Sequence, residues 1–427
     1  MFRLTRRMDR RKFLKETAKA CAAIAAPTII PASALGLGNR AAPSERIVLG
    51  GIGIGNRGGS VLAGMLPEPD VQFVAVADVQ KSRRDAVKAM ADARNGNTDC
   101  ATYQDFREVL ARPDIDAVLI ATGDRWHTIA SIHAAAAGKD IYCEKPISIT
   151  IAETRAMQSA VDRAGIIFQG GMQRRNVGNF VFAANLARSG KLGRIHTVHA
   201  HMMDPSTTQE WLPAQSEPPK EECDWDMWLG PCPWRPYNSA YLRGCGAWIP
   251  HFDLSAGGIL GWGSHTIDLC QWGADVEDTS AVEYEPRPDG GVARYANGIK
   301  LVMRMEGWMG LGTCSARYEG DEGWVEAGDS GQVRCHPASL LAERKIQAGE
   351  GTSPLGHGRE FFDCVKSRRR PSANHHVAAH SHITSHAAQI AWWLNRPLKF
   401  DPSKDEFIGD EAANRLRSRA MREPWSI

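Results

Sequence analysis

The feature that most constrains the fold is a glycine-rich stretch, IVLGGIGIGNRGGSVLAGML, at residues 47–66. An apolar segment leads into the glycines, and a segment with helical spacing follows them. Gly53, Gly55 and Gly58 form the pattern G-x-G-x-x-G, which by itself is a weak signal. Asp78, however, stands twenty residues after Gly58, at the end of the next apolar segment. A strand, a glycine turn, a helix and a second strand ending in an acid are typical of a dinucleotide-binding unit.

Each part of this unit has a chemical task. Glycines let backbone N–H groups approach a pyrophosphate, and the helix N-terminus favours its negative charge. Asn56 and Arg57 lie between the glycines and are expected at the cofactor. The carboxylate of Asp78 would accept hydrogen bonds from ribose hydroxyls and repel a 2′-phosphate. We therefore expect NAD rather than NADP, although Arg83 and Arg84 could weaken that preference, and we disfavour a glycine turn that binds nothing.

The order of apolar and amphipathic segments predicts two domains. Up to residue 168, buried strands alternate with helices, which predicts a doubly wound parallel sheet of the Rossmann type with right-handed crossovers. Beyond it, the pattern predicts an α+β domain with a large, mostly antiparallel sheet. We expect a signal peptide at residues 1–34 and a linker at 35–45. The Rossmann domain is expected at 46–168, the second domain at 169–400 and an extended tail at 401–427.

Individual elements follow from the same periodicities. In the first domain the expected strands are 46–51, 71–78, 116–122, 140–143 and 166–169, and the expected helices are 57–66, 81–94, 126–137 and 151–164. In the second domain we expect a helix at 180–188, a long strand at 195–203 and an ordered loop region over the site at 204–256. Another helix at 258–272, several strands within 280–333 and a final helical segment at 357–393 are expected to follow.

Composition narrows the classes of partner. The chain has 427 residues, is 43% hydrophobic and carries a net charge of +2, with acids and bases mixed along it. This balance gives no indication of a nucleic-acid partner and favours a small-molecule ligand. We expect no integral membrane segment, because no apolar run reaches the eighteen or more residues that a spanning helix needs. The ten cysteines lack metal-binding spacing, although one disulfide among Cys223, Cys232 and Cys245 stays open.

The N-terminus resembles a twin-arginine export signal. DRRKFLK at residues 9–15 precedes a mildly apolar stretch, and Ala-Ser-Ala at 32–34 fits a cleavage site. A basic, frayed arm is the alternative. We expect the twin-arginine translocase as a partner during export, and a mature chain that begins near Leu35 and works in the periplasm or otherwise outside the cytoplasmic membrane.

Residues 117–148, AVLIATGDRWHTIASIHAAAAGKDIYCEKPIS, resemble the Gfo/Idh/MocA oxidoreductase family. Three further segments carry the resemblance toward the C-terminus: WDMWLGPCPWRPYN, GWGSHTIDLCQWG and FDPSKDEFIGDEAANRLRSRAMREPW. The resemblance implies an NAD-linked enzyme that acts on sugars. It also implies a cofactor site that includes Thr122, Trp126, His127, Glu144 and Lys145.

Lys145 is the candidate catalytic base. Oxidation of a hydroxyl to a ketone sends a hydride to nicotinamide and a proton to a base, so a titratable group must stand beside the carbinol. Lys145 follows a strand at the edge of the sheet where nicotinamide should lie, and desolvation would lower its pKa. The resemblance implies the same role.

His265 and Asp268 form a second candidate group, because on a helix they share a face with Gly261. We expect the carboxylate to orient the imidazole, which would act as a proton relay or bind a substrate hydroxyl. Many family members carry Asp where this chain has Gly261, so a carboxylate is missing and extra room is expected instead.

Other side chains are weaker candidates. Gln173, Arg174 and Arg175 are expected to line the cleft as substrate-binding residues, with structural ion pairing an equal alternative for the arginines, and His251 is a further candidate. Two groups of histidines invite a metal interpretation: His199 and His201, and His376, His380, His382 and His386. We expect no metal, because neither group has the H-E-x-x-H context.

Three functions compete. The first is an NAD-dependent oxidoreductase that acts on a sugar, sugar acid or glycoside. The second is an NAD-dependent glycosidase that oxidises the ring transiently, eliminates the aglycone, adds water and re-reduces, with tightly bound cofactor. The third is a sensor without catalysis, which Glu144-Lys145-Pro146 disfavours. A homo-oligomer is expected from the broad sheet of the second domain.

Overall fold

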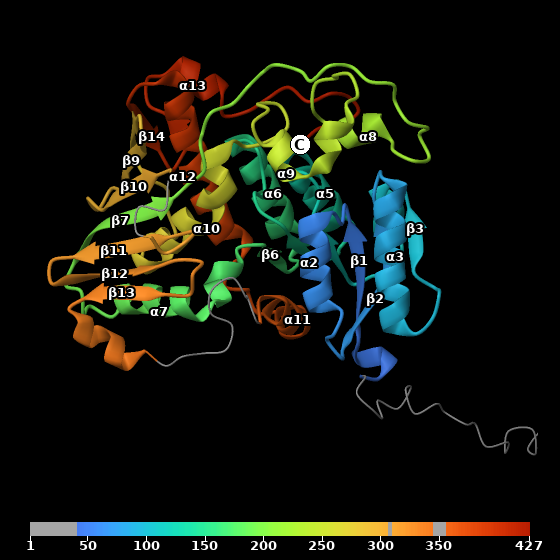
Figure 1. The fold of residues 1–427 in the computed structure, drawn as a ribbon, viewed down its shortest axis with the longest axis horizontal. Helices are drawn as coiled ribbons and strands as arrows, with labels where there is room; N and C mark the ends of the chain where they lie inside the picture. The colour runs from blue at the N-terminus through green and yellow to red at the C-terminus, as the bar shows by residue number, and fades with distance from the viewer. Residues whose placement is uncertain (1–40, 306–309, 345–355) are drawn as a thin grey trace, which may run out of the picture. The chain divides into compact units, whose positions relative to one another are not determined.

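A computed structural model describes residues 41–305, 310–344 and 356–427 (Figure 1). The chain divides into two units, Met1–Arg46 and Ile47–Ile427. The described part of the first unit contains a short 3₁₀ helix, η2 (Pro43–Glu45), and Arg46 donates a hydrogen bond to the backbone oxygen of Ala41. The expected signal peptide, residues 1–34, lies outside the described residues.

The second unit begins with a six-stranded parallel sheet in the order β3-β2-β1-β4-β5-β6. Its strands are β1 (Ile47–Ile52), β2 (Val71–Ala77), β3 (Ala101–Tyr103), β4 (Ala117–Ile120), β5 (Asp140–Cys143) and β6 (Phe168–Gly170). The helices between them are α2 (Asn56–Met65), α3 (Lys81–Asn95), α4 (Phe106–Leu110), α5 (Asp124–Ala136) and α6 (Ile151–Ala164). The predicted doubly wound parallel sheet is confirmed.

The strand order reverses between β1 and β4, so the chain leaves these neighbouring strands toward opposite sides of the sheet. Such a switch point opens a crevice at the carboxyl ends of the strands, where ligands of these folds bind. Strand β3 and helix α4 were not predicted, because three- and five-residue elements are too short to show a hydrophobic period.

The rest of this unit is built on a nine-stranded sheet in the order β13-β12-β11-β7-β10-β9-β8-β14-β15. Its strands are β7 (Ile195–His201), β8 (Glu283–Arg287), β9 (Gly290–Arg294), β10 (Lys300–Arg304), β11 (Ala316–Gly320), β12 (Gly323–Ala327), β13 (Val333–His336), β14 (Leu398–Asp401) and β15 (Glu406–Phe407). Strands β7 and β10 pair in parallel, and the other described pairs are antiparallel. The predicted large, mostly antiparallel sheet is therefore confirmed.

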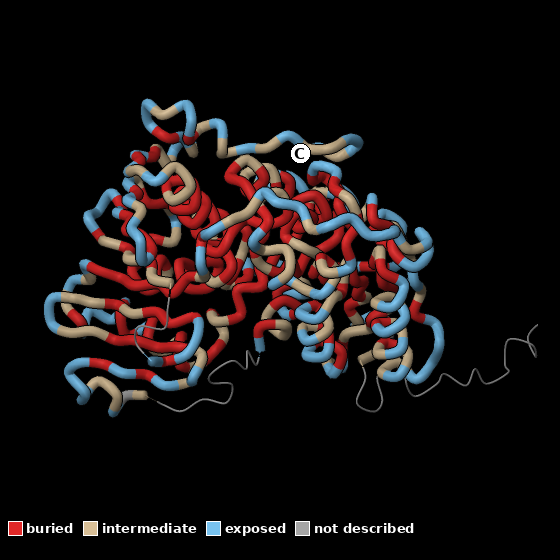
Figure 2. Tube along the Cα trace, turned by 45° about the horizontal axis from the view of Figure 1, so that its top comes forward, coloured by how far each residue is buried: buried red, intermediate tan, exposed pale blue. Residues whose placement is uncertain are grey.

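Helices pack on this sheet and link it to the first one. They are α7 (Gly178–Arg188), α10 (Gly258–Gly273) and α12 (His375–Leu394), with α11 (His357–Ser367) beside α2. Helix α12 also contacts α6 of the first sheet, so it joins both halves of the unit. Figure 2 shows that these central helices and the strands are mostly buried, whereas the outer loops and turns are exposed.

The segment between β7 and α10 is an ordered region with little regular structure, as the sequence predicts. It contains the short helices α8 (Trp225–Leu229), η4 (Ser239–Arg243) and α9 (Cys245–Trp248). Two further short helices, η3 (Gln173–Asn176) and η5 (Ala338–Glu343), follow β6 and β13.

The C-terminal segment differs from the expected extended tail. Residues 401–427 first add β15 and α13 (Glu411–Arg415) beside the large sheet, and only the last residues run extended. Trp425 then packs edge-on against Trp126 of α5, with ring centroids 4.6 Å apart.

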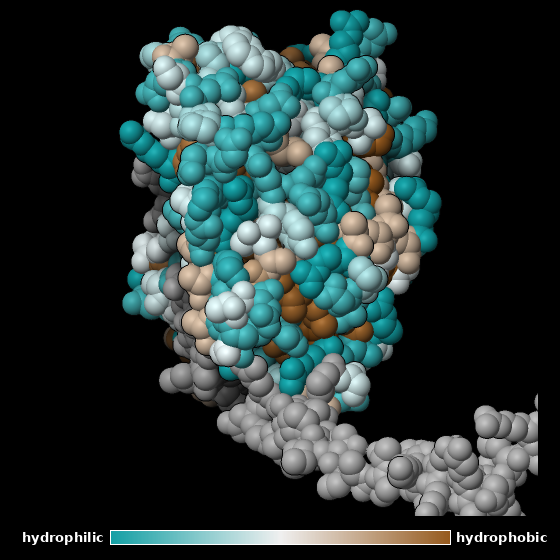
Figure 3. All heavy atoms as spheres, turned by 90° about the vertical axis from the view of Figure 1, so that its right-hand side faces the viewer, coloured by the Kyte–Doolittle hydropathy of each residue, from teal (hydrophilic) through white to brown (hydrophobic). Residues whose placement is uncertain are grey.

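No helix in the described ranges is both long and apolar enough to span a lipid bilayer. The face drawn in Figure 3 is largely hydrophilic, with small separate areas of hydrophobic residues.

Candidate functional site

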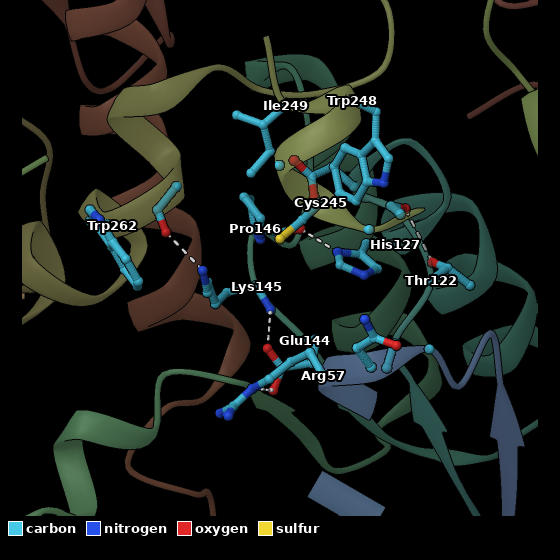
Figure 4. A pocket seen from close by; sticks show the side chains of 18 of the residues that line it. Arg57, Thr122, His127, Glu144, Lys145, Pro146, Cys245, Trp248, Ile249 and Trp262 are labelled. Atoms are coloured by element: carbon cyan, nitrogen blue, oxygen red, sulfur yellow. Dashed lines mark hydrogen bonds and ion pairs between the residues drawn. The ribbon is translucent and has the colours of Figure 1, made fainter. Parts of the chain in front are cut away.

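A cavity of about 730 Å³ lies at the carboxyl ends of β1, β4 and β5, where the first sheet meets α10 and the loop region 204–256. Its lining includes Gly55, Thr122, Lys145, Trp248, Trp262 and His265. A narrow pocket adjoins it along the end of β2 and is lined by Asp78, Arg125, Met227 and Trp228 among others. Figure 4 shows Lys145 pointing toward Trp262, with Trp248, Ile249 and Cys245 on another side of the pocket.

The glycine turn fits closely against the end of β4. Gly53 has φ +66°, and a Cβ on it would stand 2.2 Å from Cγ2 of Thr122. A Cβ on Gly58 would stand 2.7 Å from Cβ of Ala121. Both positions therefore require glycine, and α2 begins directly at Asn56 with no side chain capping its first N–H groups. These free donors suit an anionic group at the mouth of the cavity.

Asp78 ends β2 beside the narrow pocket. Its Oδ1 accepts a hydrogen bond from the backbone N–H of Gln80 at 2.9 Å, whereas Oδ2 is buried and has no partner among the described residues. Burial raises the pKa of this carboxyl, and the nearby Arg83 opposes that shift. An unsatisfied buried acceptor at this place fits a ribose hydroxyl. Arg84 donates to the backbone oxygens of Asp78 and Glu221.

Trp126 and His127, both expected at the cofactor, lie in different surroundings. Trp126 donates from Nε1 to the backbone oxygen of Met227 and lines only the narrow pocket. His127 lines the main cavity, where its Nδ1 donates to the backbone oxygen of Pro146 at 2.5 Å. Burial lowers the pKa of His127 to about 4, so the ring is neutral, and its Nε2 has no partner in the described structure.

Lys145 is partly buried at the end of β5. Its Nζ donates to the backbone oxygen of Gly261 at 2.7 Å and lies 5.4 Å from the ring centre of Trp262. Desolvation lowers the pKa of Lys145, while the neighbouring carboxylate of Glu144 opposes the shift. The amine is thus fixed in the cavity and easier to deprotonate than an exposed lysine.

Glu144 is buried beneath Lys145. Its Oε1 accepts from Nε2 of Gln173 at 2.5 Å and lies 3.5 Å from Nε of Arg57. Gln173 also donates to the hydroxyl of Tyr142. Gln173 and Arg57 therefore both line the cavity, as expected, and both hold Glu144 in place.

His265 is oriented by a different partner from the expected one. Nη1 of Arg174 donates to its Nε2 at 2.7 Å, and Arg174 is itself paired with Asp329. The hydroxyl of Thr313 also donates to Asp329 at 2.6 Å. Burial and then the charge of Arg174 hold the pKa of His265 well below its usual range. The proton of this neutral ring must sit on Nδ1, which has no partner in the described part of the chain.

Asp268 does not orient His265, which corrects the sequence interpretation. Its two oxygens pair with Arg175 at 2.7 and 2.8 Å, and Arg175 pairs also with Glu277. Neither Asp268 nor Arg175 is among the residues that line the cavity. The helical spacing was right, but His265 and Asp268 face different partners.

Gly261 leaves no extra room, contrary to expectation. A Cβ at this position would stand 2.4 Å from Sδ of Met203, so that side chain fills the space that the missing carboxylate would take. The backbone oxygen of Gly261 faces Lys145 instead.

His251 lies outside the cavity lining and packs against Tyr241, with ring centroids 5.1 Å apart. The nine described cysteines are free, so the disulfide left open in the sequence is absent among them. Cys245 is exposed at the cavity.

The histidines considered for metal have other partners. In the described ranges, one group has metal-ligand geometry: Asp162, His375 and His376. In this group, Oε1 of Gln158 accepts a hydrogen bond from Arg155, so Nε2 of Gln158 is the atom that faces His376 and donates to its Nδ1. Nε2 of His376 must then carry the proton and cannot bind a metal in this arrangement.

The other histidines of α12 bond to protein groups. His382 accepts from the backbone N–H of Ile147 and contacts the hydroxyl of Ser264, and His386 contacts the hydroxyl of Ser148. His380 contacts the backbone oxygen of Glu277. His199 lies 3.4 Å from Glu319, and His201 contacts the backbone oxygen of Met305.

Several cavity residues were missed from the sequence: Asp124, Arg125, Arg243, Trp262, Thr313 and Asp329. Asp124 directly follows the turn after β4, so its position at a strand end could have revealed it. Burial raises its pKa to about 6, and Ser255 donates to it at 2.8 Å. Arg243 ends the short helix η4, and Asp329 lies in the loop after β12. Both are far along the chain, where no local pattern marks them.

Two family models match the chain. One describes the NAD-binding Rossmann fold of an oxidoreductase family at residues 47–172, and the other its C-terminal alpha/beta domain at residues 206–427. The chain belongs to the Gfo/Idh/MocA oxidoreductase family. Its first domain is an NAD-binding domain, which agrees with the glycine turn and the unsatisfied Asp78.

Curated relatives match over part of their length. The uncharacterized oxidoreductase YrbE of Bacillus subtilis is 32% identical over 162 residues, which cover 38% of this chain and 46% of the relative. Myo-inositol 2-dehydrogenase of Thermotoga maritima is 27% identical over 37% of this chain and 46% of its own. A glycosyl hydrolase family 109 protein of Saccharopolyspora erythraea is 37% identical over 26% of this chain and 24% of its own. The chain thus spans less than half the length of these relatives in each match.

Solved structures show the same fold. Aldose-aldose oxidoreductase from Caulobacter crescentus has a TM-score of 0.60 at 17% identity and covers 83% of this chain and 100% of its own. Levoglucosan dehydrogenase in complex with NADH and levoglucosan has a TM-score of 0.59 at 19% identity, covering 83% and 99%.

Proposed function

We propose that the protein transfers a hydride between NAD and a hydroxyl carbon of a sugar, sugar acid or glycoside, with Lys145 as the acid/base. The observation that carries this proposal is the position of its Nζ inside the main cavity, held by Gly261 and made less basic by burial. NAD supplies the hydride acceptor when it is bound. The relatives that act on inositol, and the fold shared with levoglucosan dehydrogenase, support this class of substrate.

The side chains around Lys145 have separable tasks. In oxidation its neutral amine accepts the hydroxyl proton of the substrate, and in reduction the ammonium returns it. His265 presents an N–H at Nδ1 that can donate to a substrate oxygen, because Arg174 occupies Nε2. His265 is a poor base, since the donor from Arg174 and burial both oppose its protonation. Trp262 offers an aromatic face on the same side as Lys145.

The second candidate is an NAD-dependent glycosidase that oxidises the ring transiently and re-reduces it within one turnover. The observation that favours it is the 37% identity to the glycosyl hydrolase family 109 protein, over 114 residues. In such a cycle Lys145 would take the hydroxyl proton in the first step and return it in the last. No NADH would accumulate, because the cofactor ends each turnover in its starting state.

Location and assembly are further parts of the proposal. Export by the twin-arginine route would favour an enzyme that keeps its cofactor, since free NAD is scarce outside the cytoplasm. Fractionation of cells that express the full chain, compared with an Arg10→Lys/Arg11→Lys variant, tests this export. Homo-oligomerisation is tested by sedimentation of the purified protein.

The deciding experiment incubates the purified protein with NAD and a panel of sugars, sugar acids and aryl glycosides. NADH formed in step with substrate consumed supports the oxidoreductase, and released aglycone without net NADH supports the glycosidase. Lys145→Ala is expected to lower kcat at least about a thousandfold, while NAD affinity changes by less than about threefold. Lys399→Ala, on an exposed position of β14, is the control. Near-normal turnover by Lys145→Ala would remove the proposed base.

The pH profile gives a second readout. Oxidation needs the neutral amine of Lys145, so its rate should rise with pH up to the lowered pKa of that group and level off above it. A rate that falls over this range would contradict the assignment.

A further inference from the structure

Three arginines line the main cavity near the glycine turn without forming a salt bridge in the described structure: Arg83, Arg125 and Arg243. Two other cavity arginines differ, because Arg57 lies 3.5 Å from Glu144 and Arg174 pairs with Asp329. No salt bridge in the described structure therefore neutralises these three guanidinium groups at one end of the cavity. This is the end where α2 begins and where backbone N–H groups are free.

Arg125 is buried and built into the wall of the cavity. Its guanidinium lies 3.7 Å from the ring centre of Trp228, and its Nε donates to the backbone oxygen of that residue at 2.8 Å. Its Nη1 packs against Gly123, since a Cβ on that glycine would stand 2.3 Å from this nitrogen. Nη1 is buried and has no hydrogen-bond partner among the described residues. A buried guanidinium N–H that lacks an acceptor points to a ligand that supplies one.

Residues 219–249, here called the covering segment, lie across the nucleotide side of the first domain. The backbone N–H of Lys81 donates to the backbone oxygen of Glu222, and Arg83 donates to that of Leu242 at 3.0 Å. Gly244 closes over the glycine turn, since a Cβ on it would stand 3.9 Å from Nδ2 of Asn56. In Figure 1, α8 and α9 of this segment lie near α5 and the upper ends of α2 and α3.

Arg243 is the residue of the covering segment that immediately precedes Gly244. It is exposed at the last position of η4 and lines the cavity. Arg243 and Arg125 thus come from two different elements to one end of the cavity, close to the free N-terminus of α2.

We propose that Arg125 and Arg243 bind the pyrophosphate of NAD, from outside the glycine turn. A pyrophosphate carries two negative charges and accepts hydrogen bonds well from guanidinium groups. Its charge and its acceptor oxygens therefore suit two arginines. The covering segment then clamps the cofactor against the first domain through Arg243. This inference rests on NAD binding and not on which reaction follows.

The test compares ligands with and without phosphates. Dissociation constants of NAD, ADP and adenosine are measured by calorimetry on the full protein freed of cofactor. Arg243→Gln is expected to weaken NAD and ADP about tenfold and to leave adenosine within about twofold. Arg243→Lys should recover part of the loss, because it keeps the charge. Arg287→Gln, an exposed arginine of β8, is the matched control and should change nothing.

Arg125 is tested by Arg125→Lys and Arg125→Met. We expect NAD affinity to fall in the order wild type, Lys, Met, and the affinity for NAD to become less salt-dependent in the Met variant. Equal NAD affinity in the two variants would overturn the role of Arg125.

Two outcomes would overturn the role of Arg243. The first is NAD and ADP affinity within twofold of wild type in Arg243→Gln. The second is an equal loss for adenosine, which would mean that Arg243 only holds the covering segment. Because these readouts are binding constants, absence of turnover on sugars would leave them unaffected, so the proposed reaction and this inference can fail independently.

Discussion

His382 should make the protein lose stability on mild acidification. Its Nδ1–H donates to the backbone oxygen of Ala378 at 2.7 Å, and its Nε2 accepts from the backbone N–H of Ile147 at 3.2 Å. A second proton on Nε2 would face the N–H of Ile147 in a buried place. Burial accordingly lowers the pKa of His382 from 6.5 to about 4. Because Ile147 follows the Lys145 turn, the same bonds help to fix that turn.

The size of the effect follows from proton linkage. The folded protein binds this proton less tightly than the unfolded chain, so unfolding takes up a proton once the pH drops below 6.5. With pKa values of 6.5 and about 4, the stability lost through His382 is about 0.2 kcal/mol at pH 7 and about 2 kcal/mol at pH 5. The loss grows further toward pH 4 and levels off below it.

Urea unfolding at pH 7 and pH 5, followed by circular dichroism, measures this term. His382→Gln loses some stability at both pH values, but its drop between them should be smaller than that of the wild type by about 2 kcal/mol. His336→Gln, an exposed histidine of β13, serves as the control and should show the wild-type drop. Equal drops in His382→Gln and the wild type, within about 0.5 kcal/mol, would refute the reasoning.

Two further outcomes follow from other contacts. Asp268→Ala leaves Arg175 buried with only Glu277 as a carboxylate partner, so we expect a loss of about 3 kcal/mol in urea unfolding. NAD affinity should stay unchanged, and a cofactor-binding defect without destabilisation would contradict the structural role. Asp78→Asn keeps the acceptor for Gln80 but loses the charge, so NAD should bind about tenfold more weakly, with NADP less affected, by titration calorimetry. Unchanged discrimination between the two nucleotides would contradict the ribose contact.

The elements with a full hydrophobic period were predictable. Strand β5 and helix α6 have the predicted boundaries. The ends of α6 are marked in the sequence, because Thr150 caps its N-terminus and Gly165, with φ 64°, caps its C-terminus. Thr150 accepts from the backbone N–H of Glu153. The Rossmann boundary was placed at residue 168, whereas β6 runs to Gly170.

The site was predictable where it depends on strand ends. Gly53, Gly58, Asp78 and Lys145 follow parallel strands, and the carboxyl ends of such strands meet at one edge. Residues such as Arg243 and Asp329 could not be found in this way, since they reach the cavity from a short helix and a loop that show no hydrophobic period.

The sequence alone determined that a strand, a glycine turn and a helix place free N–H groups opposite an acid, because these features depend on local backbone geometry and fixed spacing. The tertiary structure decided which partner each side chain meets. His265 and Asp268 are neighbours on one helix, yet Arg174 takes the first and Arg175 the second. A hydrogen bond or ion pair depends on atoms brought together from distant parts of the chain, and helical spacing does not specify them.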